Sequence, residues 1–547
     1  MKLFKRNKIY LSPGQKKIRN KEISFAVISG ILLGVSFTPF PFSYFSFFAL
    51  IAFFYVLEKR DSLASINRFS YVTFFIFNVI TLYWIGSWTK ETDPFLMISG
   101  VLLLFFNPLF YLIITTIYYF SKRSFGKKTA LLLFPLYWVF FEYLYSVTDL
   151  RFPWLTLGNS LAKFILFIQS ADVVGVYGLS LIILYINIFI YLGIKNYSSA
   201  KKVNVKYLSA GAFIFLVVLI YGIVQLNTYK IPQEKIKVGL IQPNLNPWDK
   251  WKEGNISSQL DIYFDLSQKA IDKGAQIIIW PESALPVYLL SGNYDIEVGR
   301  IRQFVFSKNI YLLTGMPDAN FYINQSEAPP EAKKTSRGTT YTSYNSILLF
   351  SPNTLNIQKY GKIKLVPFGE HVPFVEQFPF LGDFIKWEVG ISSWNVGKEQ
   401  TVFEIPQNEI SVKVAAVVCI ESIYPEFISD FIKKGANVIT VVTNDSWYGY
   451  SSGPFQHKEI SVLRAIENRR FVVRAANGGI SCIIDPLGNT ISSTKLFTRD
   501  FLVGEVFLGD GLTFYTRFSF IIPYLVSIMS LLTIIIFIYK KITKRLI

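Results

Sequence analysis

The sequence predicts a membrane α-helical bundle of eight transmembrane helices joined to a large extracytoplasmic α/β domain. Three observations carry this prediction. Hydrophobic residues make up 51% of the 547 residues and the mean hydropathy is +0.36, which is too apolar for an ordinary soluble protein of this length. The long apolar runs lie before residue 230 and after residue 516. Between them, short strand-like segments alternate with longer helix-like segments, a pattern typical of α/β domains.

Eight apolar runs approach the ~20 residues that a helix needs to cross a bilayer. They are 24–40, 43–57, 69–87, 95–120, 129–146, 173–194, 207–228 and 518–539. No small-residue cleavage site follows the first run, so we expect a retained helix rather than a cleaved signal peptide. Glu142 lies inside the fifth run and is expected to face the bundle interior or a cavity, either with a functional role or merely hydrogen-bonded.

The orientation follows from the loops, because cytoplasmic loops carry an excess of Lys and Arg. The two termini and three loops on one side hold 23 basic residues, whereas the short loops on the other side hold three: Lys90, Arg151 and Lys163. We therefore expect both termini in the cytoplasm and the polar region on the periplasmic face. The expected parts are a basic N-terminus (1–22), a seven-helix bundle (23–229), a periplasmic α/β domain (230–516) and an eighth helix with a basic tail (517–547).

The charge and the rare residue types exclude several classes of function. The net charge is +18, but the basic residues cluster between apolar runs, as membrane topology requires, so nucleic-acid binding is not expected. Two Cys and two His exclude a disulfide framework and make a zinc site or a His-centred triad hard to assemble. We expect no metal and no cofactor. Acid–base chemistry must then rely on carboxylates, Lys or Tyr.

The polar domain is expected to alternate strands with helices. Strands are predicted at 235–242, 275–280, 310–315, 344–350, 412–419, 437–443, 479–484 and 501–507. Helices are predicted at 256–273, 294–308 and 456–475, and the polar insert 322–341 shows no periodic signal. Cys482 falls within a predicted strand and is interpreted as a core residue.

Three strand-end segments bring together residue types suited to acyl transfer. Glu282 follows an apolar strand and a proline, where desolvation would raise its pKa and suit it to general-base catalysis. Lys362 and Lys364 share a face if their segment is a strand, and a lysine in a cleft stabilises an oxyanion. Cys419 ends the apolar strand and is followed by Glu421; a cysteine needs only a base and an oxyanion site to act as a nucleophile.

Each of these segments also has a commoner structural explanation when taken alone. Glu282 would be a turn or helix-capping carboxylate, the two lysines would be solvated on a loop, and Cys419 would be a core cysteine. The functional interpretation depends on their combination. Because the only histidines are His371 and His457, a Glu–Lys–Cys arrangement is the natural alternative to Cys–His.

In order and spacing, Glu282 in WPES, Lys362 in YGKIKLVPFGE and Cys419 in VVCIE resemble the Glu–Lys–Cys triad of the nitrilase superfamily. The NDSWYG segment at 444–449 is also similar to that superfamily, as are other polar residues downstream: Gln456, His457, Arg464, Glu467, Asn468 and Arg474. Seven spans before the domain, one after it and the FPW segment at 152–154 make the whole chain resemble its membrane branch, the apolipoprotein N-acyltransferases.

The resemblance implies an α-β-β-α sandwich in the bacterial inner membrane and a ping-pong acyl transfer through a cysteine thioester. The implied donor is a phospholipid, phosphatidylethanolamine in the family, and the implied acceptor is the α-amine of the N-terminal diacylglyceryl-cysteine of an apolipoprotein; a monomer is expected. Glu282 would be the general base, Lys362 would stabilise the tetrahedral intermediates and Cys419 would carry the acyl group. Supporting or substrate-binding roles fall to Glu370, Glu421, Trp251, Trp447 and Tyr448.

One position departs from the family pattern: Ile420 follows the nucleophile where enterobacterial members have Tyr, and Tyr424 is the nearby candidate to replace that hydroxyl. Two other functions remain open. One is a membrane-tethered amidase or nitrilase acting on a small amide, although seven helices exceed what a tether requires. The other is a non-enzymatic lipid-binding or transport protein, which would be expected to have lost one of the three triad residues.

Overall fold

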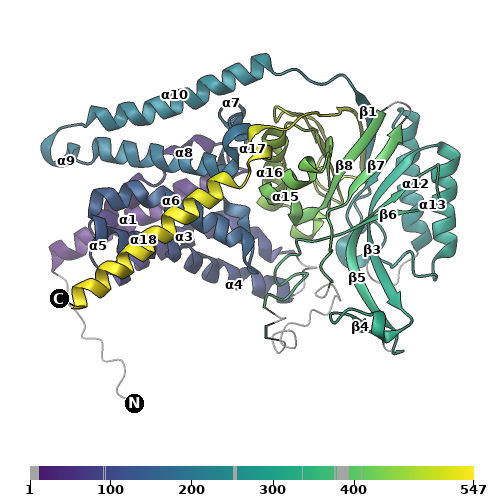
Figure 1. Ribbon diagram of the computed structural model, residues 1–547, viewed down its shortest axis with the longest axis horizontal. Coiled ribbons are helices and arrows are strands. Elements are labelled where there is room, and N and C mark those ends of the chain that lie inside the picture. Colours follow the sequence, from purple (N-terminus) through teal and green to yellow (C-terminus); the bar gives the residue numbers. More distant parts are fainter. Residues whose placement is uncertain are drawn as a thin grey trace.

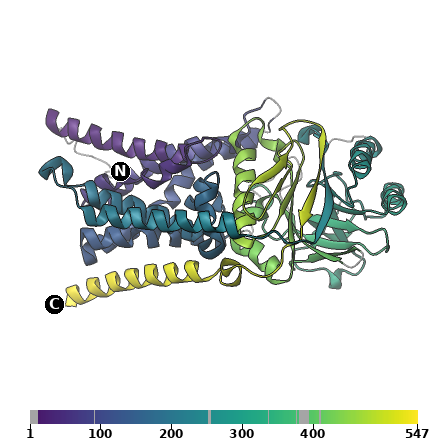
Figure 2. The same cartoon turned by 90° about the horizontal axis from the view of Figure 1, so that it is seen from above.

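In the computed structural model, which describes residues 12–89, 92, 94–250, 256–335, 337–374, 377, 378, 394–407 and 410–546, a helical bundle and a two-sheet domain lie end to end (Figure 1). Helix α1 begins, and helix α18 ends, at the end of the bundle that lies away from the sheets (Figure 2). The helices of the bundle therefore run towards the domain and away from it, as expected for a membrane part that carries a domain on one face.

The first part of the bundle has long helices joined by short turns. Its elements are α1 (Pro13–Val35), η1 (Ser43–Phe47), α2 (Ile51–Glu58), α3 (Leu63–Leu82), η2 (Tyr83–Gly86), α4 (Pro94–Phe110), α5 (Leu112–Phe125) and α6 (Lys127–Val147). The second part is η3 (Pro153–Leu155), η4 (Leu157–Leu161), α7 (Ile165–Ile168), α8 (Ala171–Ile194), α9 (Tyr197–Ala200) and α10 (Val205–Thr228), with α17 (Phe514–Arg517) and α18 (Ile521–Leu546) after the domain.

Within the described residues, six helices are long and apolar enough to cross a membrane. They lie at Leu63–Gly86, Leu96–Phe125, Lys127–Val147, Ala171–Ile194, Val205–Thr228 and Ile521–Thr543. The other two predicted spans are helical but differ from this pattern. Helix α1 starts in the basic segment and ends at Val35 rather than at residue 40, and the apolar segment Ser43–Glu58 is short and divided between η1 and α2. The count of eight spans stays a prediction.

Glu142 faces the interior of the bundle. It is 4% exposed, and its Oε1 accepts hydrogen bonds from Trp138 Nε1 (2.8 Å) and from the backbone N–H of Leu157 (2.7 Å). The expectation of an inward-facing side chain is therefore confirmed. These bonds hold the start of η4 against α6.

The domain begins with a sheet of seven strands in the described residues, in the order β13-β1-β2-β3-β5-β4, with β6 paired to β5. Its elements are β1 (Lys235–Gln242), α11 (Pro247–Lys250), α12 (Ile256–Asp272), β2 (Ile277–Trp280), α13 (Asp295–Lys308), β3 (Tyr311–Tyr322), η5 (Gln325–Glu327), β4 (Lys333–Lys334), β5 (Thr340–Phe350), β6 (Gln358–Gly361) and β13 (Asp500–Phe507). Helices α12 and α13 cover its outer face (Figure 1).

The second sheet has six strands in the same described part of the chain, in the order β12-β11-β10-β9-β8-β7. Its elements are β7 (Val402–Gln407), β8 (Ile410–Val418), η6 (Cys419–Ile423), α15 (Pro425–Lys433), β9 (Val438–Thr443), η7 (Asp445–Tyr448), α16 (Ser452–Asn468), β10 (Val472–Ala476), β11 (Cys482–Ile484) and β12 (Thr490–Ser493). Helices α15 and α16 separate this sheet from the bundle (Figure 1). The layers confirm the α-β-β-α sandwich.

Two sequence predictions within the domain are wrong in detail, and an insert without a periodic signal contains strand residues. Helix α16 ends at Asn468, because Arg469 adopts a left-handed conformation (φ +48°), and the expected continuation to residue 475 is instead strand β10. The insert 322–341 is not irregular throughout, since β3 and β5 extend into it and pair from Leu312↔Phe350 to Tyr322↔Thr340. Strand β6 ends at Gly361, so Lys362 and Lys364 do not share a strand face.

One buried side chain of helix α16, that of Gln456, joins the domain to the bundle at several points. Gln456 Oε1 accepts hydrogen bonds from Trp154 Nε1 (2.8 Å) and Trp84 Nε1 (3.1 Å). Its Nε2 donates to the carbonyl oxygens of Thr38 (3.0 Å) and Thr81 (3.1 Å). One amide therefore satisfies polar groups from three separate membrane segments, each of which would be costly to leave unpaired away from water.

Substitution of Gln456 with Ala should destabilise the protein by about 2–4 kcal/mol, because Trp154 Nε1 and the Thr38 carbonyl oxygen lose a buried partner, whereas Trp84 Nε1 and the Thr81 carbonyl oxygen still bond each other (2.8 Å). Thermal unfolding of the purified protein in detergent, followed by intrinsic fluorescence, measures the effect. The control is Lys458→Ala on the same helix, which removes a partly exposed ion pair with Glu459 (3.1 Å) and should change the Tm much less. Equal Tm values for the two variants would contradict this role of Gln456.

Candidate active site

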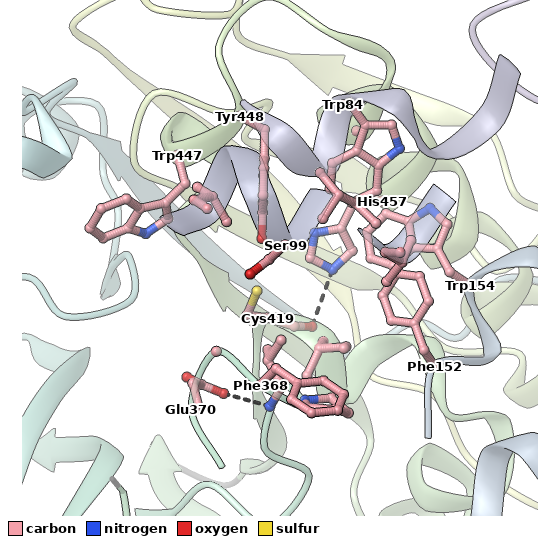
Figure 3. A pocket seen from close by; sticks show the side chains of 18 of the residues that line it. Trp84, Ser99, Phe152, Trp154, Phe368, Glu370, Cys419, Trp447, Tyr448 and His457 are labelled. Atoms are coloured by element: carbon pink, nitrogen blue, oxygen red, sulfur yellow. Dashed lines mark hydrogen bonds between the residues drawn. The ribbon is translucent and has the colours of Figure 1, made fainter. Parts of the chain in front are cut away.

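A cavity of about 720 Å³ lies between the domain and the bundle. On the domain side it is lined by residues that follow strand ends, among them Glu282, Asn345, Lys362, Glu370 and Cys419. On the bundle side its wall is formed by η2, α4 and the segment around η3. The three segments that the sequence singled out therefore converge on one cavity, and Figure 3 shows Cys419 and Glu370 among the residues that line it.

Glu282 follows β2 and is 8% exposed. Its Oε1 accepts a hydrogen bond from Asn345 Nδ2 (2.8 Å), and its Oε2 accepts one from the backbone N–H of Asn444 (3.0 Å). Burial raises the pKa of the Glu282 carboxyl, Lys362 opposes that shift, and the neighbouring Glu370 adds to it. A carboxylate with a raised pKa and a fixed orientation is suited to accept and return a proton near neutral pH.

Lys362 is buried between two carboxylates. Its Nζ lies 2.9 Å from Glu370 Oε1 and 2.8 Å from Glu370 Oε2, but 3.7 Å from Glu282 Oε1. Burial opposes the charge on Lys362, yet Glu370 and Glu282 raise its pKa above the ordinary value. Glu370 is itself fixed by the backbone N–H of Val366 (2.9 Å) and by Asn345 Nδ2 (3.1 Å). The ammonium is thus permanently charged and aimed into the cavity.

Cys419 stands at a sharp turn between β8 and η6. Its φ of +50° is the left-handed conformation, which costs a non-glycine residue about 1–2 kcal/mol. The turn lifts the half-buried thiol out of the strand and into the cavity. Burial raises the pKa of Cys419, Glu282 raises it further, and Lys362 opposes the shift. The resting thiol is therefore neutral and needs a base before it can attack a carbonyl carbon.

Glu421 holds this turn to the segment that carries Lys362. Its Oε1 accepts from Tyr360 Oη (2.7 Å) and from the backbone N–H groups of Ile363 (2.7 Å) and Lys364 (3.0 Å). Its Oε2 accepts from the backbone N–H of Val418 (2.8 Å). Glu421 is fully buried, and its hydrogen bonds fix the Cys419 turn relative to the segment that carries Lys362.

A second network behind the turn was not assigned from the sequence. His457 Nε2–H donates to the carbonyl oxygen of Cys419 (3.1 Å), and His457 Nδ1 lies 2.9 Å from Asp445 Oδ1. Arg474 donates to Asp445 Oδ2 (2.5 Å). Although burial acts in the opposite direction, Arg474 and His457 lower the pKa of Asp445 well below its ordinary value. The resemblance included these residues, but only the fold brings them together behind Cys419.

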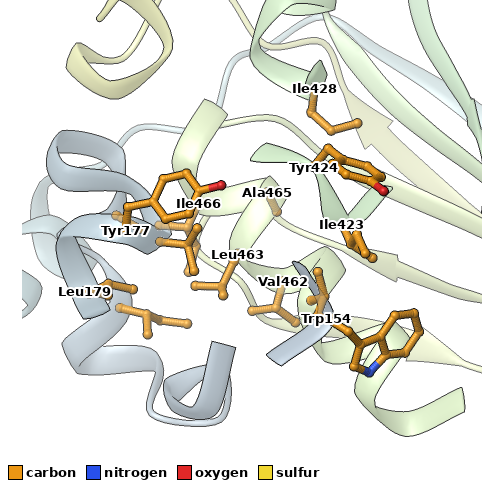
Figure 4. Packing of buried hydrophobic residues seen from close by; sticks show 14 of the residues in the cluster. Trp154, Tyr177, Leu179, Ile423, Tyr424, Ile428, Val462, Leu463, Ala465 and Ile466 are labelled. Atoms are coloured by element: carbon orange, nitrogen blue, oxygen red, sulfur yellow. The ribbon is translucent and has the colours of Figure 1, made fainter. Parts of the chain in front are cut away.

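The same helix packs firmly on the bundle. Val462, Leu463 and Ile466 of α16 belong to one buried hydrophobic cluster with Tyr177 and Leu179 of α8 (Figure 4). All five side chains are buried. The helix that supports the Cys419 turn is therefore the helix that forms the junction with the membrane part, so the cavity and the bundle are held in one fixed arrangement.

The bundle wall of the cavity is apolar and reaches the outer surface of the bundle. Ile98, Leu102 and Phe106 of α4 line the cavity and are 55%, 50% and 57% exposed. Helix α4 can approach η2 closely because Gly100 has no side chain; a Cβ at this position would lie 2.5 Å from the Cα of Gly86. Glu282, Lys362 and Cys419 thus share a cavity with apolar side chains that are exposed on the outside of the bundle.

The other predicted site residues fall in different places. Trp447 and Tyr448 line the cavity, and Tyr448 points towards Cys419 (Figure 3). Ile420 also lines it, whereas Tyr424 does not and instead donates to the carbonyl oxygen of Arg151 (3.3 Å). Trp251 lies outside the described residues.

Lys364 is separated from Lys362 and takes no part in the cavity wall. Its Nζ lies over the rings of Tyr424 (5.6 Å) and Phe427 (5.7 Å). Cys482 is fully buried in β11, as the sequence predicts. The described residues contain no group of three or more His, Cys, Asp or Glu side chains that could hold a metal ion.

Two family models match the chain. The model of the apolipoprotein N-acyltransferase N-terminal domain matches residues 29–189, and the carbon–nitrogen hydrolase model matches residues 237–511. The apolipoprotein N-acyltransferase of Chlorobaculum tepidum is 32% identical over 533 residues, covering 96% of this chain and 98% of that protein. The Geobacter metallireducens protein of that name is 31% identical (93% of each chain), and the Rickettsia typhi protein is 30% identical (90% and 92%).

Substitution of Glu421 with Gln should slow the alkylation of Cys419 by iodoacetamide. In this variant an amide N–H replaces a carboxylate oxygen and faces backbone N–H groups that now lack an acceptor. Loss of a hydrogen bond to a charged group costs about 1.5–3 kcal/mol, which corresponds to a roughly 10- to 100-fold lower alkylation rate. The rate is read from the mass of the Cys419 peptide.

The control is Glu426→Gln on α15. Burial raises the pKa of Glu426 to about 7, so an uncharged amide at that position resembles its protonated form. This variant should react at nearly the wild-type rate. An equally small effect of both substitutions would contradict the role assigned to Glu421.

Proposed function

The chain belongs to the apolipoprotein N-acyltransferase family, and from this premise we propose that Cys419 carries a fatty acyl chain as a thioester between a phospholipid and a lipoprotein. It is a membrane-bound N-acyltransferase of lipoprotein maturation, with a phospholipid as the donor class and an apolipoprotein as the acceptor. The proposal concerns which residues act, which donor is used and how the protein is oriented.

In the first half-reaction, Glu282 accepts the thiol proton of Cys419 while the sulfur attacks an ester carbonyl carbon of the phospholipid. The ammonium of Lys362 stabilises the tetrahedral oxyanion, because a buried positive charge is worth most where negative charge develops. Collapse of the intermediate breaks the ester C–O bond. The departing oxygen takes the proton from Glu282, and a lysophospholipid leaves.

In the second half-reaction, the α-amine of the diacylglyceryl-cysteine attacks the thioester carbonyl. Glu282 accepts a proton from the amine, and Lys362 again stabilises the oxyanion. The C–S bond breaks, the sulfur of Cys419 recovers a proton from Glu282, and an amide-linked acyl chain leaves on the acceptor. One base and one cation serve both steps, which is the pattern of ping-pong kinetics.

The observation that carries the proposal is the shared cavity. Glu282, Lys362 and Cys419 line it together with exposed apolar residues of α4. Acyl chains cost about 0.8 kcal/mol per methylene to expose to water, so a reaction on two lipids requires a site that chains enter from the hydrocarbon. A small-amide hydrolase has no need of such a wall.

The donor, the orientation and the assembly complete the proposal. Phosphatidylethanolamine is the proposed donor, following the family resemblance. The excess of Lys and Arg in the termini and alternate loops supports cytoplasmic termini and a domain on the periplasmic face of the inner membrane. The protein is proposed to act as a monomer.

Purified protein in detergent, given phosphatidylethanolamine and a diacylglyceryl-cysteinyl peptide, should add one amide-linked acyl chain to that peptide. Cys419→Ala should give no product, and Glu282→Gln should reduce the rate by about 10²-fold or more, as expected for loss of a general base. Because the pKa of Glu282 is raised above 4.5 and its ionised form is the base, the rate should fall as the pH drops through that raised pKa.

Mass spectrometry of the peptide and of released lysophospholipid measures both half-reactions. Cys482→Ala serves as the matched cysteine control and should retain activity. Full transfer by a verified Cys419→Ala protein would contradict the scheme. Hydrolysis of small amides without transfer to the lipopeptide would instead support the amidase alternative.

A further inference from the structure

Lys250 is a buried lysine near the proposed base, Glu282, and it has no role in either proposed half-reaction. It is the last residue of α11 and is 3% exposed. Its Nζ donates a hydrogen bond to the carbonyl oxygen of Ser283. Ser283 follows Glu282 directly and has a left-handed φ of +48°. Lys250 therefore fixes the strained end of the turn that carries the Glu282 carboxylate.

The charge of Lys362 alone does not balance the two buried carboxylates, Glu282 and Glu370, when both are ionised. Glu282 and Glu370 are two buried carboxylates that share a single ammonium, that of Lys362, and Lys362 lies closer to Glu370 (2.8 Å) than to Glu282 (3.7 Å). Were both carboxylates ionised, this group would carry a net charge of −1 away from bulk water, which is costly. A positive charge on Lys250 would make the buried group neutral.

Lys250 and Glu282 are coupled electrostatically. Burial lowers the pKa of Lys250 to about 7, and Glu282 opposes that shift. Linkage is reciprocal, so the charge on Lys250 must favour the ionised form of Glu282 to the same extent. Among the described residues, the charged or titratable groups that interact with Glu282 are Lys250, Lys362, Glu370, Cys419 and Tyr448, and of these the two lysines favour its ionisation.

We propose that Lys250 is a positioning residue for Glu282: it holds the Glu282–Ser283 turn through the Ser283 carbonyl, and its charge keeps the proposed base ionised. The inference rests on the proposed role of Glu282 as general base. The short helix that ends at Lys250 also carries Trp248, which lines the cavity and meets Trp447 edge-on at 4.9 Å. Lys250 thus connects an aromatic part of the cavity wall to the base.

The test uses the rate of Cys419 alkylation by iodoacetamide as a function of pH, in purified full-length protein without lipid substrate. Lys250→Gln, which can still donate to Ser283 but is uncharged, should move the acid limb of the profile to higher pH by roughly half a unit or more. Lys250→Met should show the same shift and also a lower rate at its own optimum, because the turn loses its hydrogen bond. Lys364→Met removes a lysine outside the cavity and should leave the limb in place.

A second measurement applies to a protein with Lys250 intact. Competitive labelling with acetic anhydride reports the pKa of Lys250, which should be lower in Glu282→Gln than in wild type because the coupled carboxylate is gone. An unshifted acid limb in Lys250→Gln, or an unchanged Lys250 pKa in Glu282→Gln, would overturn the proposal.

The same alkylation experiments distinguish failure of the role proposed for Lys250 from failure of the role proposed for Glu282. If Glu282→Gln alkylates with the wild-type pH profile, the base assignment itself fails. If Glu282→Gln removes the acid limb while Lys250→Gln leaves it in place, only the role of Lys250 fails.

Discussion

The unequal sharing of one buried ammonium between two carboxylates is the interaction on which the proposed reaction centre depends. Lys362 lies within 2.9 Å of both oxygens of Glu370 and 3.7 Å from Glu282. Glu370 is therefore the direct counter-ion of Lys362. Glu282 lies near enough to interact with the charge of Lys362 but does not form a close ion pair with it, so its carboxylate can exchange a proton. Two carboxylates with different environments can take different roles, one as a fixed counter-ion and the other as the proposed base.

This charged centre has to be held next to apolar side chains, and the fold does so with fully buried polar contacts. Glu421 joins the Cys419 turn to the Lys362 segment through four hydrogen bonds. Gln456 and His457 are neighbours on α16. Gln456 forms hydrogen bonds with polar groups of the bundle, and His457 donates one to the carbonyl oxygen of Cys419. Because one helix makes both connections, the position of Cys419 is set by the same packing that sets the position of the apolar cavity wall.

The sequence predicts the architecture and the three triad candidates, because long apolar runs, strand-end polar residues and motif spacing are local signals. It does not predict that α16 stops at Asn468, since the end depends on a left-handed Arg469 with no glycine or proline to mark it. Nor does it predict that Lys362 and Lys364 separate, because the end of β6 is set by pairing with β5. The role of Lys250 depends on a contact with Ser283, 33 residues away, and no local pattern reveals such a contact.

The most direct measurement is the mass of the Cys419 peptide after the purified protein has been mixed with phosphatidylethanolamine and no acceptor. The account predicts a fatty-acyl mass increment on that peptide, removed by hydroxylamine and absent in Lys362→Met, together with one equivalent of lysophospholipid. An unmodified Cys419 peptide, from folded protein whose thiol is shown to be reduced, would contradict the proposed acyl-enzyme.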